Sequence, residues 1–220
     1  MKIDVITQLK SKQRRLAMLT LVALLGIVAL VTATKQDRLS NDNEVVSEVV
    51  TQSTESPEER LPDDVGFNWK GRSTDPKRIQ IPAIGVDAFM QSVGVDQNSQ
   101  IAVPNNIHVA GWFVDSVRPG DQGLSIIDGH INGRYTDEGI FKRLNELKVD
   151  DTVRVVFGDD SVREFRVYSA ASHSLTDAPS VLYSQVPEIK NQLNLITCIG
   201  SYDVANRTYD SRHIVILEAV

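Results

Sequence analysis

The stretch Leu195-Ile196-Thr197-Cys198-Ile199-Gly200 holds the only cysteine of the chain. It closes an apolar run that begins at Leu193, and such a run is typical of a buried strand. Gly200 follows at once, so we expect the strand to break just past the thiol. A thiol at a strand end, beside a loop, can meet solvent and substrate, whereas a thiol in the middle of a core cannot.

Two further polar residues stand at the ends of other apolar runs. His130 ends the run that starts at Leu124, and Arg212 opens the run that continues to Leu217. A thiol attacks an amide only as the thiolate, a histidine can protonate the departing amine, and an arginine can stabilise the oxyanion. If the fold brings them together, Cys198 is the nucleophile of a cysteine acyl-transfer site, His130 its general acid and Arg212 its oxyanion and substrate stabiliser.

Each of these residues also has an ordinary structural interpretation. A lone cysteine is more often a small buried hydrophobe, and a lone arginine is usually a surface charge. His108, His173 and His213 compete with His130 for the acid role. We expect His108 to be structural within a strand and His173 to lie in a polar loop. Because neighbours on a strand alternate, His213 should face away from Arg212.

Composition and charge exclude several classes of function. The 220 residues carry a formal net charge of −6 and the pI is about 5.2, so nothing points to nucleic acid. A single cysteine rules out an internal disulfide and a cysteine-rich metal site, and the scattered histidines lack paired ligand spacing. We therefore expect no metal and no cofactor.

The N-terminus has the pattern of a transmembrane signal anchor. Residues 1–15 form a basic tail, and residues 16–34 are an uncharged run long enough to span a bilayer as a helix. Because the basic tail precedes the run, we expect it in the cytoplasm and the rest of the chain outside the cell membrane. The alternative is a cleaved signal peptide, although its apolar region would be shorter.

A polar segment separates this anchor from a folded domain. Residues 35–75 are rich in charged, hydroxyl and amide side chains with few apolar ones, so we expect a flexible linker. Phe67 and Trp69 are exceptions, which either dock on the domain as a lid or are stray aromatics in the linker. The domain is expected at 76–220, a common size for a single domain.

The domain has the pattern of a mainly β fold. Short apolar runs with strand-like alternation are separated by turn residues, and about eight of them argue for a closed or nearly closed barrel. The expected strands are 78–81, 88–93, 108–113, 124–130, 152–157, 164–170, 192–198 and 212–219. Two short helices are expected at 140–147 and at about 177–185, the second with Asp177 as a possible cap.

Several blocks of this sequence resemble the sortases, the membrane-anchored cysteine transpeptidases of mainly Gram-positive cell surfaces. Gly129-His130 matches the histidine motif of that family. The run from Asn194 to Cys198 is similar to its TLxTC box, with asparagine where threonine is usual. The other blocks that resemble the family are 78–88, Val103-Pro104, 109–113, 139–147, Ser201-Tyr202-Asp203 and 209–212. The details of Gly111-Trp112-Phe113 and of 201–203 look closest to class E or F.

The resemblance implies a fold and a reaction. The fold is an eight-stranded sortase-type β-barrel with short helices, preceded by a transmembrane helix, with His130, Cys198 and Arg212 around one groove. The reaction is cleavage of an LPxTG-like sorting signal between Thr and Gly through a thioacyl enzyme at Cys198. An amine such as a peptidoglycan precursor then resolves that intermediate. The implied partners are surface proteins bearing a C-terminal sorting signal and this amine acceptor.

The resemblance also places substrate contacts. A connection at 171–191, long for a compact barrel, leads into the strand that carries Cys198. In the sortases the matching loop holds the Leu-Pro part of the signal. The expected substrate-binding residues are Thr197, Ala178, Pro179, Val181 and Leu182.

Other classes of function stay open at this point. A cysteine hydrolase or protease of surface proteins would use the same residues, and product analysis with and without an added amine decides between them. A non-catalytic surface-binding barrel would not need His130, Cys198 and Arg212 intact. An L,D-transpeptidase would carry a Ser-x-Gly-Cys box, which Thr197-Cys198 lacks.

Overall fold

The computed structural model describes residues 47–62 and 67–220. The predicted anchor at 16–34, and the predicted linker as far as residue 46, lie outside the described residues. Within the described ranges, no helix is both long and apolar enough to cross a membrane.

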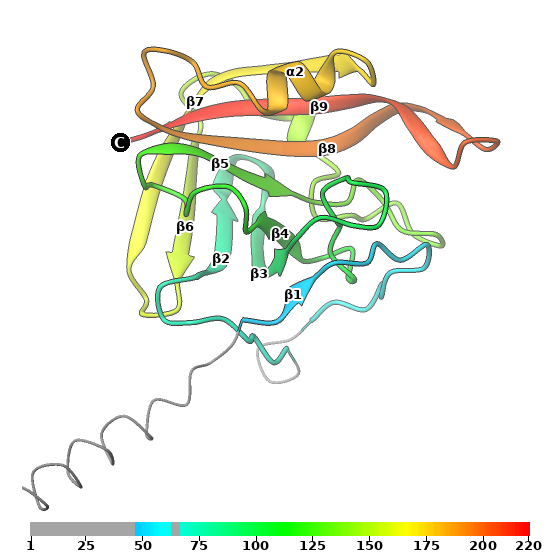
Figure 1. The fold of residues 1–220 in the computed structure, drawn as a ribbon, viewed down its shortest axis with the longest axis horizontal. Coiled ribbons are helices and arrows are strands. Elements are labelled where there is room, and N and C mark those ends of the chain that lie inside the picture. Colours follow the sequence, from blue (N-terminus) through cyan, green and yellow to red (C-terminus); the bar gives the residue numbers. More distant parts are fainter. Residues whose placement is uncertain (1–46, 63–66) are drawn as a thin grey trace, which may run out of the picture. The chain divides into compact units, whose positions relative to one another are not determined.

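All eight predicted strands are present. In chain order they are β2 (Pro76–Ile81), β3 (Val86–Val93), β4 (Ala110–Phe113), β5 (Gly123–Asp128), β6 (Thr152–Phe157), β7 (Val162–Ser174), β8 (Asn191–Asp203) and β9 (Thr208–Ala219). Strands β7, β8 and β9 are longer than predicted, and β8 and β9 form a hairpin that extends past the other strands (Figure 1).

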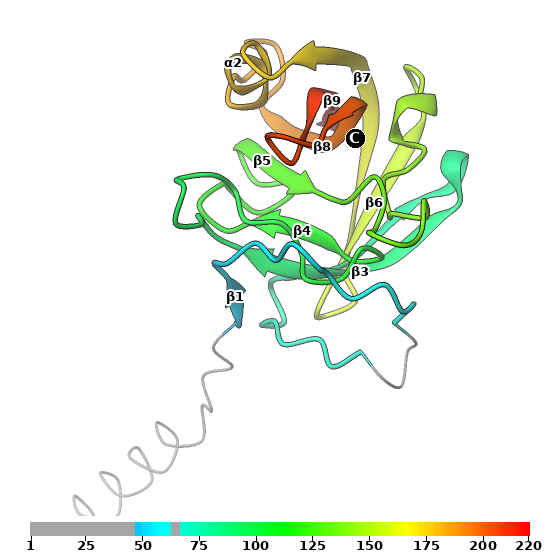
Figure 2. The same ribbon diagram turned by 90° about the vertical axis from the view of Figure 1, so that its right-hand side faces the viewer.

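The strands form one sheet that closes into a barrel. The order is β1-β3-β2-β6-β7-β9-β8-β5-β4, where β1 (Val49–Val50) is a short additional strand, and β4 returns to pair with β3. Most neighbours are antiparallel, but β5 runs parallel to β8. Figure 2 shows these strands around the barrel, with the short helix α2 (Ala178–Leu182) on the outside.

Side-chain alternation separates the interior of the barrel from its outer face. The interior is filled by a buried apolar cluster that includes Ile79, Val155, Leu195 and Leu217. A second cluster lies on the outside of β5, β8 and β9, under α2. Its members on the barrel side are Val93, Ala102, Phe113, Ile126 and Ile214, with the half-buried Ile196 packed against them. Cys198 follows Ile196 by two residues and therefore belongs to the outer face.

The two predicted helices differ from those observed. Residues 140–147 hold only a 3-10 turn at Leu144–Glu146, although Phe141, Leu144 and Leu147 are buried as the spacing predicts. The second helix is α2, shorter than 177–185, and the side chain of Asp177 makes no capping hydrogen bond. Instead, Asp177 accepts a hydrogen bond of 2.7 Å from the Ser174 hydroxyl. Short segments packed by a few apolar residues do not need a full helix to bury them.

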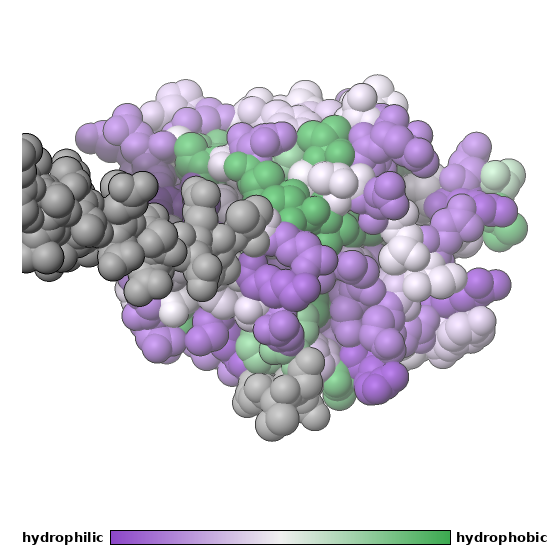
Figure 3. Space-filling view, turned by 60° about the horizontal axis from the view of Figure 1, so that its bottom comes forward, coloured by the Kyte–Doolittle hydropathy of each residue, from purple (hydrophilic) through white to green (hydrophobic). Residues whose placement is uncertain are grey.

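The described part of the predicted linker is ordered against the barrel, so the expectation of a free tether is wrong there. Strand β1 pairs with β3, Phe67 stacks on Phe89 with ring centroids 4.5 Å apart, and the carboxylate of Asp75 is buried and bonded by Arg72. Figure 3 views the side of the molecule that carries this segment, where apolar surface lies between hydrophilic residues. The aromatic side chains that composition left unassigned anchor the segment through apolar contact.

Candidate active site

Cys198 and Arg212 are direct cross-strand partners on β8 and β9. On the other side of β8, the parallel register of β5 pairs Asp128 with Ile196. The amide of Gly129 continues this ladder by donating to the carbonyl oxygen of Ile196 over 3.2 Å. Strand β5 ends at Asp128, and His130 follows two residues later. The fold thus sets Cys198 and Arg212 side by side on β8 and β9, and His130 just past the end of β5, the strand that pairs with β8.

The strand that carries Cys198 does not end at Gly200, contrary to the sequence-based expectation. Strand β8 continues to Asp203, and its register against β9 shifts between Ile199 and Tyr202. Gly200 has a φ of 95°, and a Cβ there would collide with Oδ1 of Asp210. The glycine therefore forms a bulge that bends the hairpin just past the thiol.

His130 is held by a backbone carbonyl. Its Nε2 lies 2.8 Å from the carbonyl oxygen of Pro104, and because a carbonyl can only accept, Nε2 carries a proton. Nδ1 is therefore the nitrogen that takes up and gives back a proton. Burial lowers the pKa of His130, while the bond to Pro104 works in the opposite direction. The imidazole is thus neutral and ready to accept a proton at neutral pH.

The thiol of Cys198 is half-buried and is a free cysteine. Burial raises its pKa, Arg212 lowers it, and Asp128 raises it further. The resting side chain is therefore a thiol, flanked by one group that favours the thiolate and another that opposes it.

The guanidinium of Arg212 is fixed by the hairpin. Nη1 donates to the carbonyl oxygens of Tyr209 and Ser211 at 3.0 and 2.9 Å, and Nη2 donates to the hydroxyl of Thr208 at 3.0 Å. Three bonds from the strand that bears the arginine hold the cation beside Cys198 without a carboxylate partner among the described residues.

The three competing histidines lie on other elements than Cys198, and the one next to Arg212 faces the other way. His213 is buried and pairs with Thr197, and its Nδ1 lies 3.0 Å from the Ser172 hydroxyl, so it faces inward as predicted. His173 lies on β7, on the far side of Arg212, and not in a loop as predicted. His108 precedes β4 in a turn, so its predicted place within a strand is also wrong, and its Nε2 lies 3.1 Å from the carbonyl oxygen of Glu59.

Thr197 does not face the groove. It is 4% exposed and its hydroxyl donates to the carbonyl oxygen of Gly129 over 2.8 Å. Because it neighbours Cys198 on a strand, its side chain points to the opposite face. The predicted substrate contact at Thr197 is therefore wrong, and the residue instead ties β8 to the backbone just before His130.

Helix α2 covers the outer apolar cluster near the groove. Ala178 and Leu182 are 4% and 6% exposed and pack on the barrel, so their side chains are not open to a substrate as predicted. Pro179 is exposed and Val181 is half-buried at the edge of the same cluster. Of the four predicted contacts on this helix, only these two present surface.

Sequence reasoning missed Asp128, Pro104 and Tyr209. Pro104 fixes His130 through its backbone, which no side-chain pattern reveals. Burial raises the pKa of Tyr209, Asn132 lowers it, and Cys198 raises it. Asp128 left a readable signal, because a carboxyl inside the apolar run before His130 is unusual in a buried strand.

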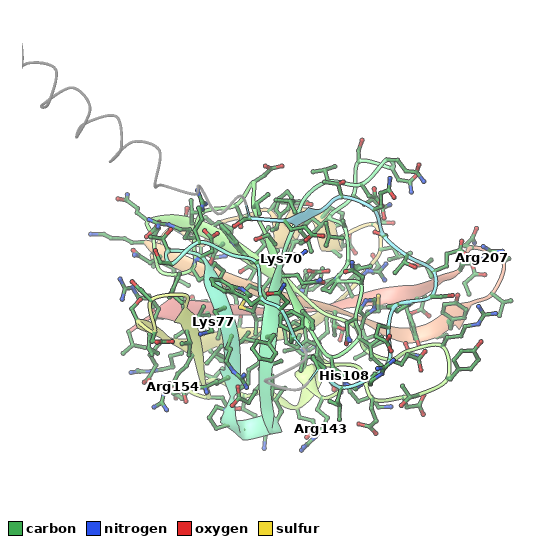
Figure 4. All side chains as sticks on the ribbon, turned by 90° about the horizontal axis from the view of Figure 1, so that it is seen from below. Lys70, Lys77, His108, Arg143, Arg154 and Arg207 are labelled. Atoms are coloured by element: carbon green, nitrogen blue, oxygen red, sulfur yellow. The ribbon has the colours of Figure 1, made fainter. Side chains whose placement is uncertain are left out.

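Two cavities lie away from Cys198. One of about 400 Å³ is lined by residues that include Arg78, Phe89, His108 and Arg143. Figure 4 shows His108 and Arg143 near one another, well away from Arg207 at the tip of the β8–β9 hairpin. The described ranges hold no group of three or more His, Cys, Asp or Glu side chains that could bind a metal ion.

The fold and these side chains define a class of protein, a β-barrel with a cysteine and an arginine paired across two strands and a histidine that follows the neighbouring strand. A model of the sortase domain matches residues 79–220. The chain therefore belongs to the sortase family, a family of cysteine transpeptidases.

Solved structures of similar fold come from the same family. Sortase A from Corynebacterium diphtheriae is 20% identical over 69% of this chain and 63% of that chain, with a TM-score of 0.51. A lid mutant of the same enzyme is 21% identical over 69% of this chain and 73% of that chain, also with a TM-score of 0.51. Sortase C-1 from Actinomyces oris is 26% identical over 66% and 75%, at 0.48. This chain thus spans less than two thirds of the first of these proteins, and no curated protein sequence matches it.

Proposed function

We propose that this chain is a membrane-anchored sortase. It cleaves the LPxTG-like sorting signal of a surface protein between Thr and Gly and joins that surface protein to a cell-wall amine. The observation that carries the proposal is the pairing of Cys198 with Arg212 across β8 and β9, with His130 just past the end of β5. Strand β5, which leads into His130, pairs with β8, which carries Cys198. Family membership supports the reaction type.

In the first half of the reaction, the sulfur of Cys198 attacks the threonine carbonyl carbon. Its proton passes to Nδ1 of His130, and the carbonyl electron pair moves onto the oxygen beside Arg212. The oxyanion then collapses, the carbon–nitrogen bond breaks, and His130 returns the proton to the departing glycine amine. A thioester on Cys198 remains.

In the second half, an amine attacks the thioester carbon and gives a proton to His130. The carbon–sulfur bond breaks, and the leaving sulfur regains a proton from the imidazolium. The amine acceptor is a peptidoglycan precursor in this proposal, and the signal-bearing partners are surface proteins. Water in place of the amine would make the same site a hydrolase.

The finer class is E or F. The blocks Gly111-Trp112-Phe113 and Ser201-Tyr202-Asp203 support this assignment. Both adjoin the site, since Gly111 pairs with Asp128 on β5 and Tyr202 packs edge-on against Tyr209.

The proposal also includes the anchor at 16–34, with a cytoplasmic tail at 1–15 and the barrel outside the cell. Protease added to intact cells should remove the barrel and spare the N-terminal tail. A mature chain that starts near residue 33 or 34 would show a cleaved signal peptide instead.

A library of LPxTG-like peptides, incubated with the detergent-solubilised full chain as the enzyme, tests the reaction. Wild type should cleave between Thr and Gly, form an adduct on Cys198 visible by mass spectrometry, and give an amide product when an amine is added. Cys198→Ala should remain folded but show no cleavage, no adduct and no amide product. Free acid as the product even at saturating amine would reassign the protein as a hydrolase, and cleavage by Cys198→Ala would exclude this nucleophile.

A further inference from the structure

The carbonyl that holds His130 belongs to a peptide unit that is also bonded at its other end. This peptide joins Pro104 to Asn105, and its carbonyl oxygen lies 2.8 Å from Nε2 of His130. Its N–H group donates to Oε1 of Gln91 over 3.2 Å. The peptide is trans, so its carbonyl and its N–H point in opposite directions within one plane. A partner that fixes the direction of the N–H therefore also fixes the direction of the carbonyl.

Gln91 lies on β3, at a point where the sheet leaves room for this loop. It pairs with Gly111 on β4, and a Cβ at Gly111 would lie 3.0 Å from Cγ of Pro104. The missing side chain thus lets the ring of Pro104 lie close to the sheet beside Gln91. Met90 is buried in the barrel interior, so the half-buried side chain of Gln91 points to the outer face, the face to which Cys198 belongs.

The two ends of the loop are held by other bonds. The N–H of Ala102 donates to the carbonyl oxygen of Gly94 over 2.9 Å, and the carbonyl oxygen of Asn105 accepts the N–H of Glu58 over 2.7 Å. Neither bond involves the carbonyl oxygen of Pro104. A peptide plane between two fixed ends can still rotate about the axis that joins them, and the bond to Gln91 opposes that rotation.

We propose that Gln91 is a positioning residue for His130 and acts through the peptide between Pro104 and Asn105. By accepting the N–H, Gln91 keeps the carbonyl aimed at Nε2 of the imidazole. The proton then stays on Nε2, and Nδ1 remains available for the proton transfers of the reaction. Hydrogen bonds in such a chain polarise one another, so the bond to Gln91 also makes the carbonyl a better acceptor. This inference rests on the proposed function, which gives Nδ1 its place in the reaction.

Nuclear magnetic resonance of the imidazole nitrogens tests the proposal on the detergent-solubilised full chain, with isotope-labelled histidine. Comparison with His130→Gln assigns the His130 signals. Gln91→Met keeps the length of the side chain and removes the acceptor, so part of the His130 population should change to the tautomer protonated on Nδ1. Gln91→Glu keeps an acceptor oxygen and should retain the wild-type tautomer. Gln80→Met, the same exchange at a half-buried position of β2, is the matched control and should leave the signals unchanged.

The same variants should separate kcat from KM for an LPxTG-like peptide. Gln91→Met should lower kcat by roughly tenfold to a hundredfold with little change in KM, because a displaced imidazole transfers protons poorly while the peptide contacts remain. Gln91→Glu should recover most of this loss. An unchanged kcat in Gln91→Met would overturn the role in turnover.

Wild-type His130 signals in Gln91→Met would overturn the proposal, because solvent or the ends of the loop would then be enough to hold the peptide plane. Equal changes in Gln91→Met and Gln91→Glu would also overturn it, since an acceptor at this position would not be what matters. If Gln91→Met does not fold, Gln91→Asn gives the same test, because its side chain is one methylene too short to reach the N–H.

The tautomer is measured without a sorting signal, so this test is separate from that of the proposed function. A changed tautomer in Gln91→Met, together with a wild type that cleaves no sorting-signal peptide, would refute the proposed function and still support this role for Gln91.

Discussion

The Nε2 atom of His130 lies 2.8 Å from the carbonyl oxygen of Pro104. The contact fixes the tautomer of the imidazole and turns Nδ1 into the nitrogen that exchanges a proton. Since the acceptor is a backbone atom, a substitution at Pro104 changes the path of the loop but cannot delete the oxygen.

Burial should keep His130 neutral at neutral pH. Its folded pKa lies below the ordinary value of 6.5, so between those two values the unfolded chain binds more protons than the folded one. Stability should therefore fall as the pH drops below about 6.5, and His130→Gln should reduce this acid-side loss. An NMR titration of the His130 ring should give a midpoint below that of a histidine in an unfolded peptide. A midpoint above it would contradict the burial argument.

Arg212 should be irreplaceable by lysine. Its three donated bonds use both terminal nitrogens of a planar group, which an ammonium cannot reproduce. We expect Arg212→Lys and Arg212→Ala each to lower kcat by about 10²–10³-fold. His173→Ala, which alters the other cross-strand neighbour of Arg212, is the matched control and should cost far less. Substantial turnover with Arg212→Lys would show that a point charge is enough.

Two substitutions in α2 should affect substrate recognition and domain stability separately. Val181→Ala should raise KM for a sorting-signal peptide with little change in melting temperature, because this side chain is half-buried at the edge of the outer apolar cluster. Leu182→Ala should destabilise the domain by about 2–5 kcal/mol, because its side chain is packed on the barrel. Replacing residues 175–190 by the loop of a sortase with a different preference should change the cleaved motif. An unchanged motif in a folded chimera would place recognition elsewhere, with the β8–β9 hairpin as the next candidate.

Glu59 should hold the loop that follows His130. Its carboxylate accepts the backbone N–H groups of Arg134 and Tyr135 at 2.6 and 3.1 Å, an arrangement in which successive amides bind an anion. We expect Glu59→Ala to speed amide exchange at residues 134 and 135 and to lower kcat, by up to about a hundredfold if the imidazole is displaced. Glu55→Ala, which removes a surface pair with Arg207, should do neither. Unchanged amide exchange in Glu59→Ala would mean that the loop keeps its conformation without this carboxylate.

Much of this fold follows from local pattern. The apolar runs and turn residues predicted eight strands, and the same alternation put His213 on the face opposite Arg212. Hydrophobic periodicity is a property of neighbouring residues, so it survives into any fold that buries one side of a strand. Residue chemistry likewise singled out Cys198, His130 and Arg212, because few side chains can act as nucleophile, acid and oxyanion donor.

Other features depend on residues far apart in the chain. Thr197 turned inward to bond Gly129, Pro104 fixed the tautomer of His130, and Glu59 reached a loop some seventy-five residues later. Asp128 came to pair with Ile196, two residues before Cys198, because β5 and β8 run parallel in one register. The sequence by itself determined which chemical groups are present and which strands carry them. Only the tertiary structure decided which groups meet, because backbone hydrogen bonds between distant strands set the register, and local pattern carries no record of that pairing.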